Sequence, residues 1–489
     1  MSEGPRIGTA RHPRASWVSR AGRAASRAAG RVGGLVPAGA GTSLGVFVAG
    51  LLLMLALQAH FRAFAHRGVY FQEHSSEDMM QTISLVDLRD HPWESLLVLH
   101  IQPPLLDSLR ALLAHLWPEL GRRALVLRVD RSLNLIWMLA YSAMALLIFR
   151  WLRHLVSSER FAALASLLFL FHPAAIYYAT YPEGTLLTSF GVLWMCYALW
   201  AVPARGATLS LCVAFLFLFS VRSIFQWPAL LMLVAALVLR RAPRRSVRVF
   251  TVSCSLVVGS FMLKQYLVLG TTSTSSFGGS SCLHALGQYP EIGISSSAAM
   301  PTLGPLFPYR TPGEYPAALT RSTKITGSHN FNTLADLANE RGLMQRCAQR
   351  LASNPLWSTL GSYAENVSIF FEPSSRYELP HEIVDRLPWR GVYDWVLSGP
   401  RLLVLLVAGG IVWARHRSRP EMARGLGLAL PLLYVAVVCM VFEKDDNMRF
   451  KFFIEPVLYV FLVAQAAALV KRRERKGATS EAVPAKAVR

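Results

Sequence analysis

Charged residues are scarce in this sequence, and acidic residues are scarcer than basic ones. Asp, Glu, Lys and Arg together make up 16% of the 489 residues, whereas 53% of the residues are hydrophobic. Soluble domains usually carry about 25% charged residues. The shortage therefore excludes an ordinary soluble domain and indicates a protein that meets lipid over much of its surface.

Cysteines and repeats are also lacking. The chain holds six cysteines and no Cys-x-x-Cys motif, which is too few for a disulfide-rich scaffold and offers no cysteine and histidine spacing for a metal site. No fixed-period repeat is visible, so a solenoid or a transporter built from obvious tandem repeats is disfavoured.

Long apolar runs are what the sequence has instead. Runs of roughly 17 to 22 apolar residues can cross a hydrocarbon core of ~30 Å as helices. We therefore expect an all-α polytopic membrane protein with about ten transmembrane helices. The expected spans are residues 43–64, 132–152, 160–180, 184–203, 207–223, 226–240, 249–269, 399–415, 423–442 and 451–470. The fifth and sixth are short, so they also suit re-entrant or broken segments.

Basic residues set the expected orientation. The formal net charge is +21, which can indicate a nucleic-acid partner, but here Lys and Arg gather at the ends of the expected spans. Cytoplasmic loops collect such residues. With the N-terminus inside, the strong basic clusters all fall on the cytoplasmic side: residues 150–160, Arg205, 240–248, 415–424 and 471–476. We expect both termini in the cytoplasm and no nucleic-acid partner.

The expected spans also divide the chain. The parts are a basic disordered cytoplasmic tail (1–42), an N-terminal transmembrane module (43–269) with a first outer loop (65–131), an extracytoplasmic domain (270–398), a C-terminal transmembrane module (399–470) and a cytoplasmic tail (471–489). A transit peptide is similar in composition to 1–42, but this tail leads straight into a correctly oriented span.

The extracytoplasmic domain is expected to be small and of mixed secondary structure. It contains Cys282 and Cys347, while the other cysteines lie in expected spans. An oxidising compartment would permit a disulfide between these two residues. Two buried free thiols are the alternative.

Carboxylates gather shortly after the first expected span. Glu73, Glu77 and Asp78 lie there, followed by an apolar pattern that predicts a helix on the membrane surface, beginning near Ser75 or Ser76. Residues in the first turn of that helix would be kept ionised by its dipole. Plain helix capping would also explain any single acid here.

The stretch "LVLHIQPPLLDSL" (97–109) interrupts an apolar run with His100, Pro103 and Pro104. Prolines break a helix and free backbone carbonyls. We expect a bent element at the membrane boundary, forming one wall of a site. A hydrogen-bonded structural role is the alternative for His100.

Basic side chains stand at the outward ends of several expected spans. Arg222 ends the fifth span, Lys264 lies near the outer end of the seventh, and Arg449 and Lys451 stand at the mouth of the tenth. A guanidinium can bind phosphate through two parallel hydrogen bonds. The alternative for each is a side chain that merely reaches lipid headgroups.

With this order and topology, the sequence resembles the GT-C superfamily of integral membrane glycosyltransferases, in particular the branch of protein O-mannosyltransferases and lipid A aminoarabinose transferases. The similar pieces are Glu77-Asp78, "HIQPPLL", "FHPAAIYYATYPEGTLLTSF", Arg222 and "NMRFKFFIEP". The resemblance covers roughly residues 43–270 and 430–470 and leaves 270–398 unmatched. That family often has Asp-Glu in the first loop, whereas this chain has Glu-Asp, so the catalytic acid stays open between the two.

The resemblance implies an inverting transfer of a sugar from a polyprenyl-phosphate donor to a lipid, glycan or protein acceptor. We expect this at the outer face of a bacterial inner membrane, toward the periplasm or the exterior. Asp78 is the expected general base and Glu77 the alternative. The other expected site residues are Arg222, Arg449, Lys451, His100 and Lys264 for the donor phosphate, and Glu73, Pro103, Pro104 and Glu183 for the pocket. Some relatives use a divalent metal, but no ligand set stands out in this sequence.

A multi-span transporter or lipid flippase is the alternative from another functional class. Embedded Arg, Lys and His residues would also suit it. Transport sites, however, lie near the bilayer midplane, where this sequence places few polar residues. A transferase of phosphate-linked or acyl groups would need a nucleophilic Ser or Thr or a metal cluster, and neither is evident.

Overall fold

The structure is a computed structural model, and it describes residues 40–65, 75–288, 301–376, 387–416, 419–442, 444 and 447–481. Within these ranges the regular elements are helices, and one isolated β bridge joins Thr323 to His329. The expected all-α architecture is therefore confirmed for this part of the chain. Residues Val46–Arg489 make up one compact unit.

Among the described residues, four helices are long and apolar enough to cross a membrane. They are α2 (Ala40–Ala65), α6 (Arg122–Leu155), α12 (Arg244–Leu269) and the Gly425–Phe442 part of α20 (Arg419–Phe442). Two bent pairs raise the number to six: α7 (Glu159–Phe169) with α8 (Pro173–Ala179), and α18 (Arg390–Val396) with residues Arg401–Ile411 of α19 (Gly399–His416).

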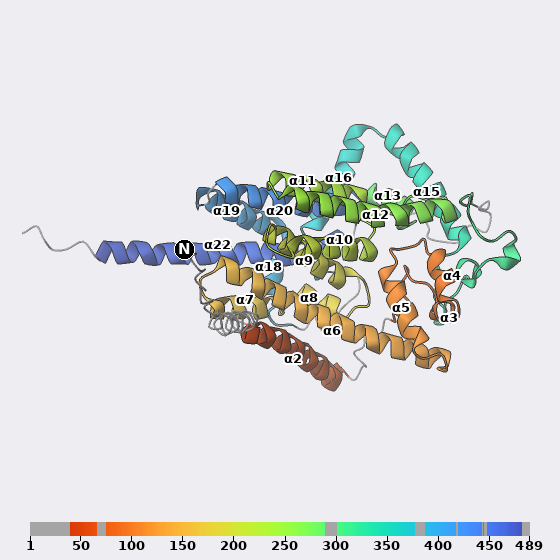
Figure 1. Cartoon of the computed structure of the whole chain (residues 1–489), viewed down its shortest axis with the longest axis horizontal. Coiled ribbons are helices and arrows are strands. Elements are labelled where there is room, and N and C mark those ends of the chain that lie inside the picture. Colours follow the sequence, from red (N-terminus) through yellow and green to blue (C-terminus); the bar gives the residue numbers. More distant parts are fainter. Residues whose placement is uncertain are drawn as a thin grey trace, which may run out of the picture. The chain divides into compact units, whose positions relative to one another are not determined.

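The full set of ten spans is not confirmed. Three of the expected spans are shorter helices, namely α9 (Thr185–Ala201), α10 (Ala207–Val221) and α11 (Trp227–Leu239), with 17, 15 and 13 residues. A straight spanning helix needs about 20 residues. They nevertheless join the helical core, because α9 packs against both α6 and α10, and α11 packs against both α12 and α20 (Figure 1). Spans beyond six stay a prediction.

The expected span 160–180 is broken, and the chain bends there by 61°. Pro173 begins α8, and its ring and missing N–H cannot continue the preceding helix. The break frees backbone groups, and side chains bind them. The Tyr141 hydroxyl donates to the Leu170 carbonyl at 2.6 Å, and His172 Nδ1 accepts from the Ala174 N–H at 3.1 Å. The bend directs the chain after α8 into the region that carries Glu183.

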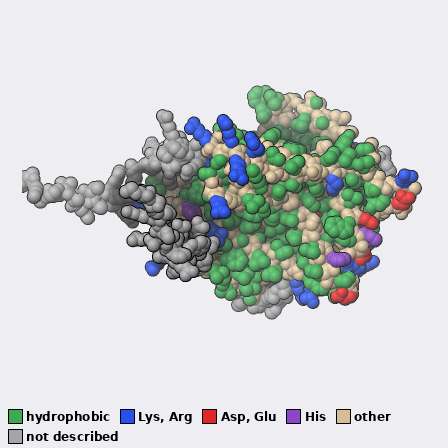
Figure 2. Space-filling model, in the orientation of Figure 1, with side chains coloured by type: hydrophobic (Ala, Val, Ile, Leu, Met, Phe, Trp, Pro, Cys, Tyr) green, Lys and Arg blue, Asp and Glu red, His purple; other side chains and the backbone are tan. Residues whose placement is uncertain are grey.

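The surface over the spanning helices is mainly hydrophobic, as Figure 2 shows. Acidic and histidine side chains gather instead at the end that carries α3 (Leu85–Asp90), α4 (Pro92–Leu97) and α5 (Leu105–His115). Exposed leucines on α10, α11 and α12 contribute to the hydrophobic surface: Leu209, Leu231, Leu256 and Leu263. A continuous apolar surface of this kind suits contact with lipid.

The segment 270–398 is helical where the structure describes it. Its helices are α13 (Gly278–Ala285), the 3-10 helix η2 (Pro312–Glu314), α14 (Ala317–Thr320), α15 (Leu334–Ser353), α16 (Leu356–Phe370) and α18 (Arg390–Val396). No strand is found among its described residues, so the mixed composition that we expected is not confirmed. α13 packs on α15 and α20, and α16 packs on α20 and α21 (Asn447–Lys451). The segment thus lies directly on a spanning helix.

The two expected tails are only partly described. Residues 1–39 and 482–489 lie outside the described ranges. Residues 471–481 continue the last helix, α22 (Glu455–Glu481), without a break. The domain boundaries inferred from the sequence therefore stay predictions.

Candidate functional site

A cavity of about 510 Å³ lies where α10 ends, α11 begins and α20 ends. Apolar side chains line one part of it: Ile224, Pro228, Val438, Phe442, Phe450 and Phe453. Hydroxyl and amide groups line another part: Gln81, Ser223, Gln226, Ser273, Ser275 and Ser281. Arg222 is the one charged side chain among these described lining residues, and we call the space the Arg222 cavity.

The Arg222 guanidinium is held from two sides. The residue follows the last turn of α10, and its guanidinium hydrogen bonds to the Glu183 carboxylate and lies 3.3 Å from Thr185 Oγ1. It also lies over the rings of Phe450 and Phe453, at 5.4 and 5.8 Å from their centroids. Aromatic faces attract a cation and keep it in apolar surroundings. The charge is therefore fixed in place at the cavity wall.

Glu183 joins Arg222 to Arg449. Arg449 Nη1 lies 3.3 Å from Glu183 Oε2, and the Thr185 hydroxyl donates to the same oxygen at 2.9 Å. Burial opposes ionisation of Glu183, but the charges of Arg449 and Arg222 outweigh it, so the pKa of this carboxyl lies below its usual range. The Glu183 carboxylate therefore lies between two guanidinium groups, one of which, that of Arg222, reaches the cavity wall. The two arginines expected to share a site do lie together.

Two other expected phosphate ligands are turned elsewhere. The buried Lys451 Nζ donates to the carbonyls of Glu372 and Leu397, at 2.5 and 2.7 Å. Lys264 Nζ donates to the Leu97 carbonyl at 2.8 Å. Neither lysine lines the Arg222 cavity. Each joins segments that are distant in sequence, and the structure brings neither to the arginine pair.

His100 is buried and bonded on several sides. The ring Nδ1 lies 2.9 Å from Ser276 Oγ. The backbone N–H of His100 donates to Asn332 Oδ1 at 3.0 Å, and its backbone carbonyl accepts from the Ser276 N–H at 2.7 Å. Burial lowers the pKa of His100 to about 4. The imidazole is therefore neutral at pH 7 and cannot serve as a cation for phosphate. The geometry fits the structural alternative, in which His100 joins the first loop to the segments after α12.

Glu77 is fully buried among donors. Its carboxylate accepts from Leu85 N–H and the Ser84 hydroxyl, both at 2.9 Å, from Ile325 N–H at 3.1 Å, and from Arg110 Nη2 at 2.6 Å. A carboxylate offers about four lone-pair sites, and here four donors occupy them. Glu77 thus holds the start of α3 and the 325 segment together. This environment favours Asp78 over Glu77 as the base.

Sequence reasoning missed Arg110, which organises this region. Besides Glu77, it donates to Asp107 Oδ1 and to the Ile83 carbonyl, both at 2.6 Å. Burial raises the pKa of Asp107, and the nearby Arg110 charge opposes that effect. A signal was present in the sequence, because Asp and Arg three residues apart lie on one face of a helix. The group is structural, since all three side chains are fully buried.

The surface helix expected to begin near Ser76 is not there. Residues 76–78 form a turn, and α3 begins at Leu85. Side chains donate to backbone carbonyls that would accept from backbone N–H groups in a helix. The Thr82 hydroxyl, for example, donates to the Ser76 carbonyl at 3.0 Å. The helix-dipole argument for Asp78 was therefore wrong. Asp78 is half-buried in this turn, and its Oδ2 accepts a long hydrogen bond, 3.4 Å, from the Ser75 N–H.

The first loop reaches the Arg222 cavity through Gln81 and Pro103, which both line it. The Ser275 hydroxyl donates to the Ile101 carbonyl at 2.7 Å and holds this wall in place. Pro104 precedes α5 and directs the chain into that helix. Of the other expected pocket residues, Glu183 orients Arg222 rather than lining the cavity. Glu73 lies outside the described residues.

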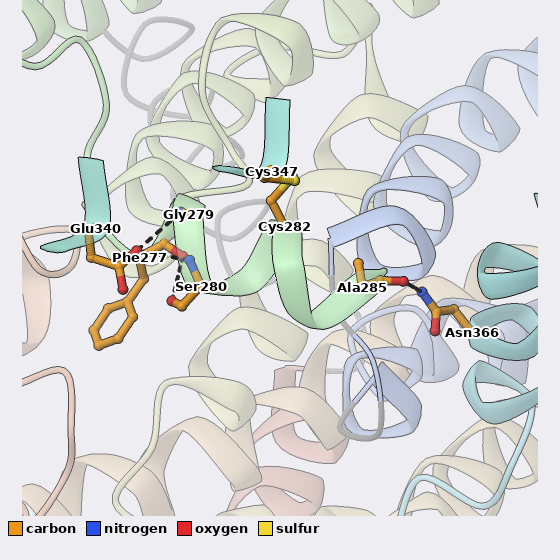
Figure 3. Close-up of a disulfide and its surroundings, with 8 residues drawn as sticks. All are labelled: Phe277, Gly279, Ser280, Cys282, Ala285, Glu340, Cys347 and Asn366. Carbon is orange, nitrogen blue, oxygen red and sulfur yellow. Dashed lines mark hydrogen bonds between the residues drawn. A yellow bond between two sulfur atoms is a disulfide. The ribbon is translucent and has the colours of Figure 1, made fainter. Parts of the chain in front are cut away.

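α13 supplies another wall and is fastened to α15 (Figure 3). The disulfide expected between Cys282 and Cys347 is present and joins the two helices. At the first turn of α13, the backbone N–H groups of Gly279 and Ser280 donate to Glu340 Oε2 of α15, at 3.1 and 3.0 Å. A covalent bond and a carboxylate at the first turn therefore both hold the helix that carries Ser281.

A second cavity, of about 450 Å³, lies toward the other end of α20. Its lining includes three indoles, those of Trp151, Trp200 and Trp413, and contains no Lys, Arg, Asp or Glu among the described residues. It lacks the charged group that phosphate chemistry needs. The Arg222 cavity is therefore the better candidate site.

The described residues contain no group of three or more His, Cys, Asp and Glu side chains placed to hold a metal ion. Comparisons with protein-family models, with curated proteins and with solved structures find no match to this chain. The functional argument therefore rests on the residues of the cavity themselves.

Proposed function

We propose that the chain is a membrane glycosyltransferase, moving a sugar from a polyprenyl-phosphate donor to an acceptor hydroxyl with inversion at the anomeric carbon. One observation carries the proposal: Arg222, held by Glu183 and backed by two phenylalanine rings, faces a cavity that has an apolar wall, formed partly by a spanning helix, and a second wall of hydroxyl and amide groups. A polyprenyl phosphate has the same two parts, a charged head and an apolar chain.

The charge at the cavity suits the leaving group. As the sugar is transferred, negative charge stays on the lipid phosphate, and a fixed guanidinium stabilises that charge. Arg222 brings its guanidinium to the cavity wall, and its ion pair with Glu183, which also contacts Arg449, holds it there. The amide of Gln226 and nearby serine hydroxyls are the kind of groups that orient sugar hydroxyls.

Asp78 is the proposed general base. Oxygen of the acceptor hydroxyl attacks the anomeric carbon, the bond from that carbon to the phosphate oxygen breaks with its electron pair left on the phosphate, and the proton passes to the Asp78 carboxylate. Asp78 lies in the turn shortly before Gln81, which lines the cavity. Glu77, with four donors on its carboxylate, has a structural role instead.

Binding of polyprenyl phosphate to purified protein in nanodiscs tests the cavity. Loss of a hydrogen bond to a charged group costs about 1.5–3 kcal/mol, so Arg222→Ala should bind about 10- to 100-fold more weakly. The matched control is Arg310→Ala, which removes an exposed arginine outside the cavity and should bind as wild type does. Equal affinity in wild type and Arg222→Ala would contradict the proposal.

A flippase would use the same lipid without breaking a bond, so a second assay separates the two. The α20 residues that line the Arg222 cavity run from Tyr434, at the middle of the span Gly425–Phe442, to Phe442 at its end, so the place of the cavity alone does not separate the two functions. Mass spectrometry of the donor after incubation with acceptor should detect free polyprenyl phosphate. If intact donor moves across liposome membranes and no free polyprenyl phosphate appears, the protein is a lipid transporter and not a glycosyltransferase.

A further inference from the structure

α15 and α16 form a helical hairpin with an unusually apolar tip. The turn between them falls at Asn354–Pro355, and on its α16 side Leu356, Trp357 and Leu360 are 67%, 80% and 44% exposed. Leu351 is exposed on the α15 side. We call Leu351, Leu356, Trp357 and Leu360 the hairpin tip. Monomeric soluble proteins rarely expose such side chains together.

The apolar face of α16 points outward along its length. At about 100° per residue, Leu356, Leu360 and Val367 fall on one face of the helix, and all three are exposed. The side turned to the protein carries Asn366 and Phe370, about 60–100° around the helix from this face. Asn366 is buried there and donates to the Ala285 carbonyl at 3.0 Å (Figure 3). Water-facing positions of a helix normally carry polar side chains, so the exposed Leu356, Leu360 and Val367 are unusual there.

Contacts of α16 place it level with the ends of spanning helices. Glu365 on α16 forms a 2.7 Å ion pair with Lys444, which follows the span Gly425–Phe442 directly. The Phe371 carbonyl, just past α16, accepts from the N–H of Gly399, where α19 begins, at 2.7 Å. Figure 1 shows α16 running crosswise to α11, α12 and α20. Its apolar face therefore continues the hydrophobic surface of the spanning helices.

The charges around the tip have one sign. No Asp or Glu occurs between Glu340 and Glu365, whereas this stretch contains Arg341, Arg346 and Arg350. Arg346 and Arg350 are exposed on α15. Tryptophan and leucine beside arginine suit the boundary between headgroups and acyl chains, because the rings enter the apolar layer and the guanidinium groups reach phosphates.

We propose that the α15–α16 hairpin is embedded in the headgroup boundary of the membrane that the spanning helices cross. The hairpin tip enters the acyl layer, and Arg346 and Arg350 bind lipid phosphates. The segment expected from the sequence to be an extracytoplasmic domain thus rests partly in lipid. The proposal does not depend on sugar transfer, since it concerns a surface away from the Arg222 cavity.

A nitroxide attached at Trp357→Cys tests the proposal in the full-length chain. In nanodiscs of phosphatidylcholine and phosphatidylglycerol, oxygen should relax this label more strongly than a water-soluble nickel chelate does. The control is Gly313→Cys, at an exposed position beside η2, where the chelate should dominate. Wild type gives the labelling background, because Cys196, Cys212, Cys254 and Cys439 are buried.

Two results would overturn the proposal. Relaxation at Trp357→Cys dominated by the nickel chelate would place the tip in water. Weak relaxation by both reagents would mean that protein covers the tip, as in a dimer of this chain. A label at Leu360→Cys reports on the same face of α16 and should agree with the first. If it too contacts the chelate, the hairpin does not enter the membrane.

Discussion

Glu77 Oε2 and Arg110 Nη2 lie 2.6 Å apart, and both side chains are fully buried. The pair joins the turn after the first span to α5, and further bonds from Glu77 reach α3 and the segment at Ile325. Opposite charges buried this deeply stabilise each other only while both are present. The pair therefore supports the framework on which the first-loop wall of the cavity rests.

Neighbouring acids should differ sharply on substitution. Removing one partner of a buried pair typically costs about 3–5 kcal/mol, so Glu77→Gln should lower the melting temperature in detergent markedly. Asp78→Asn should melt as wild type does but transfer sugar at least ~100-fold more slowly. Thermal unfolding followed by circular dichroism, together with a transfer assay, measures both. A stable but inactive Glu77→Gln would move the catalytic role to Glu77.

Variants at Lys451 and Arg449 should affect different properties: the first should lower stability, and the second should weaken donor binding. Lys451→Met leaves the buried carbonyls of Glu372 and Leu397 without their donor, so it should unfold at lower temperature. Arg449→Gln removes one of the two guanidinium groups that contact the Glu183 carboxylate beside Arg222, so it should weaken the binding of polyprenyl phosphate. The two variants are compared by melting temperature and by equilibrium binding. Weaker binding by folded Lys451→Met would restore its expected role.

Acid should weaken the protein through His100. Its pKa is lowered from 6.5 to about 4, so below pH 6.5 the unfolded chain binds a proton that the folded chain does not. Stability contributed by the neutral imidazole is present above pH 6.5 and is lost as pH falls toward 4, by about 3 kcal/mol in all. Melting temperatures across this range should fall less in His100→Gln than in wild type. Parallel pH profiles would contradict this account.

The disulfide should contribute measurably to stability. It joins Cys282 to Cys347 across 65 residues, and such bonds typically stabilise by about 2–4 kcal/mol. Adding reductant should lower the melting temperature of wild type but leave that of the double variant Cys282→Ala, Cys347→Ala unchanged. The same double variant should bind donor more weakly, because α13 lines the cavity. If reductant leaves the melting temperature of wild type unchanged, the Glu340 hydrogen bonds alone are enough to hold α13 on α15.

Much of the architecture could be predicted from composition, because apolar runs and basic clusters are simple consequences of the bilayer. The all-helical class is an example. The meeting of Arg222 with Arg449 was instead expected from the places of both residues at the ends of predicted spans. Helix lengths could not be predicted as well. Pro173 broke one expected span, and the runs that became α9, α10 and α11 are shorter than a bilayer is thick.

The buried polar groups were the least predictable part. A lysine at the end of a span looks alike in sequence whether it faces a lipid phosphate or a set of backbone carbonyls, as Lys451 does. Likewise, the turn at Asp78 depends on Arg110 and Thr82 taking backbone carbonyls that the local sequence would give to a helix. Such choices are made by contacts between segments that lie far apart along the chain.

The link between α13 and α15 also sets an order of events during biogenesis. Cysteines pair in oxidising compartments and stay reduced in the cytosol. If the segment between α12 and α15 faces outward, as the basic clusters predict, the wall that carries Ser281 is fastened only after that segment has left the cytoplasm. With that orientation, a newly made chain would hold a loosened cavity until the segment has crossed the membrane.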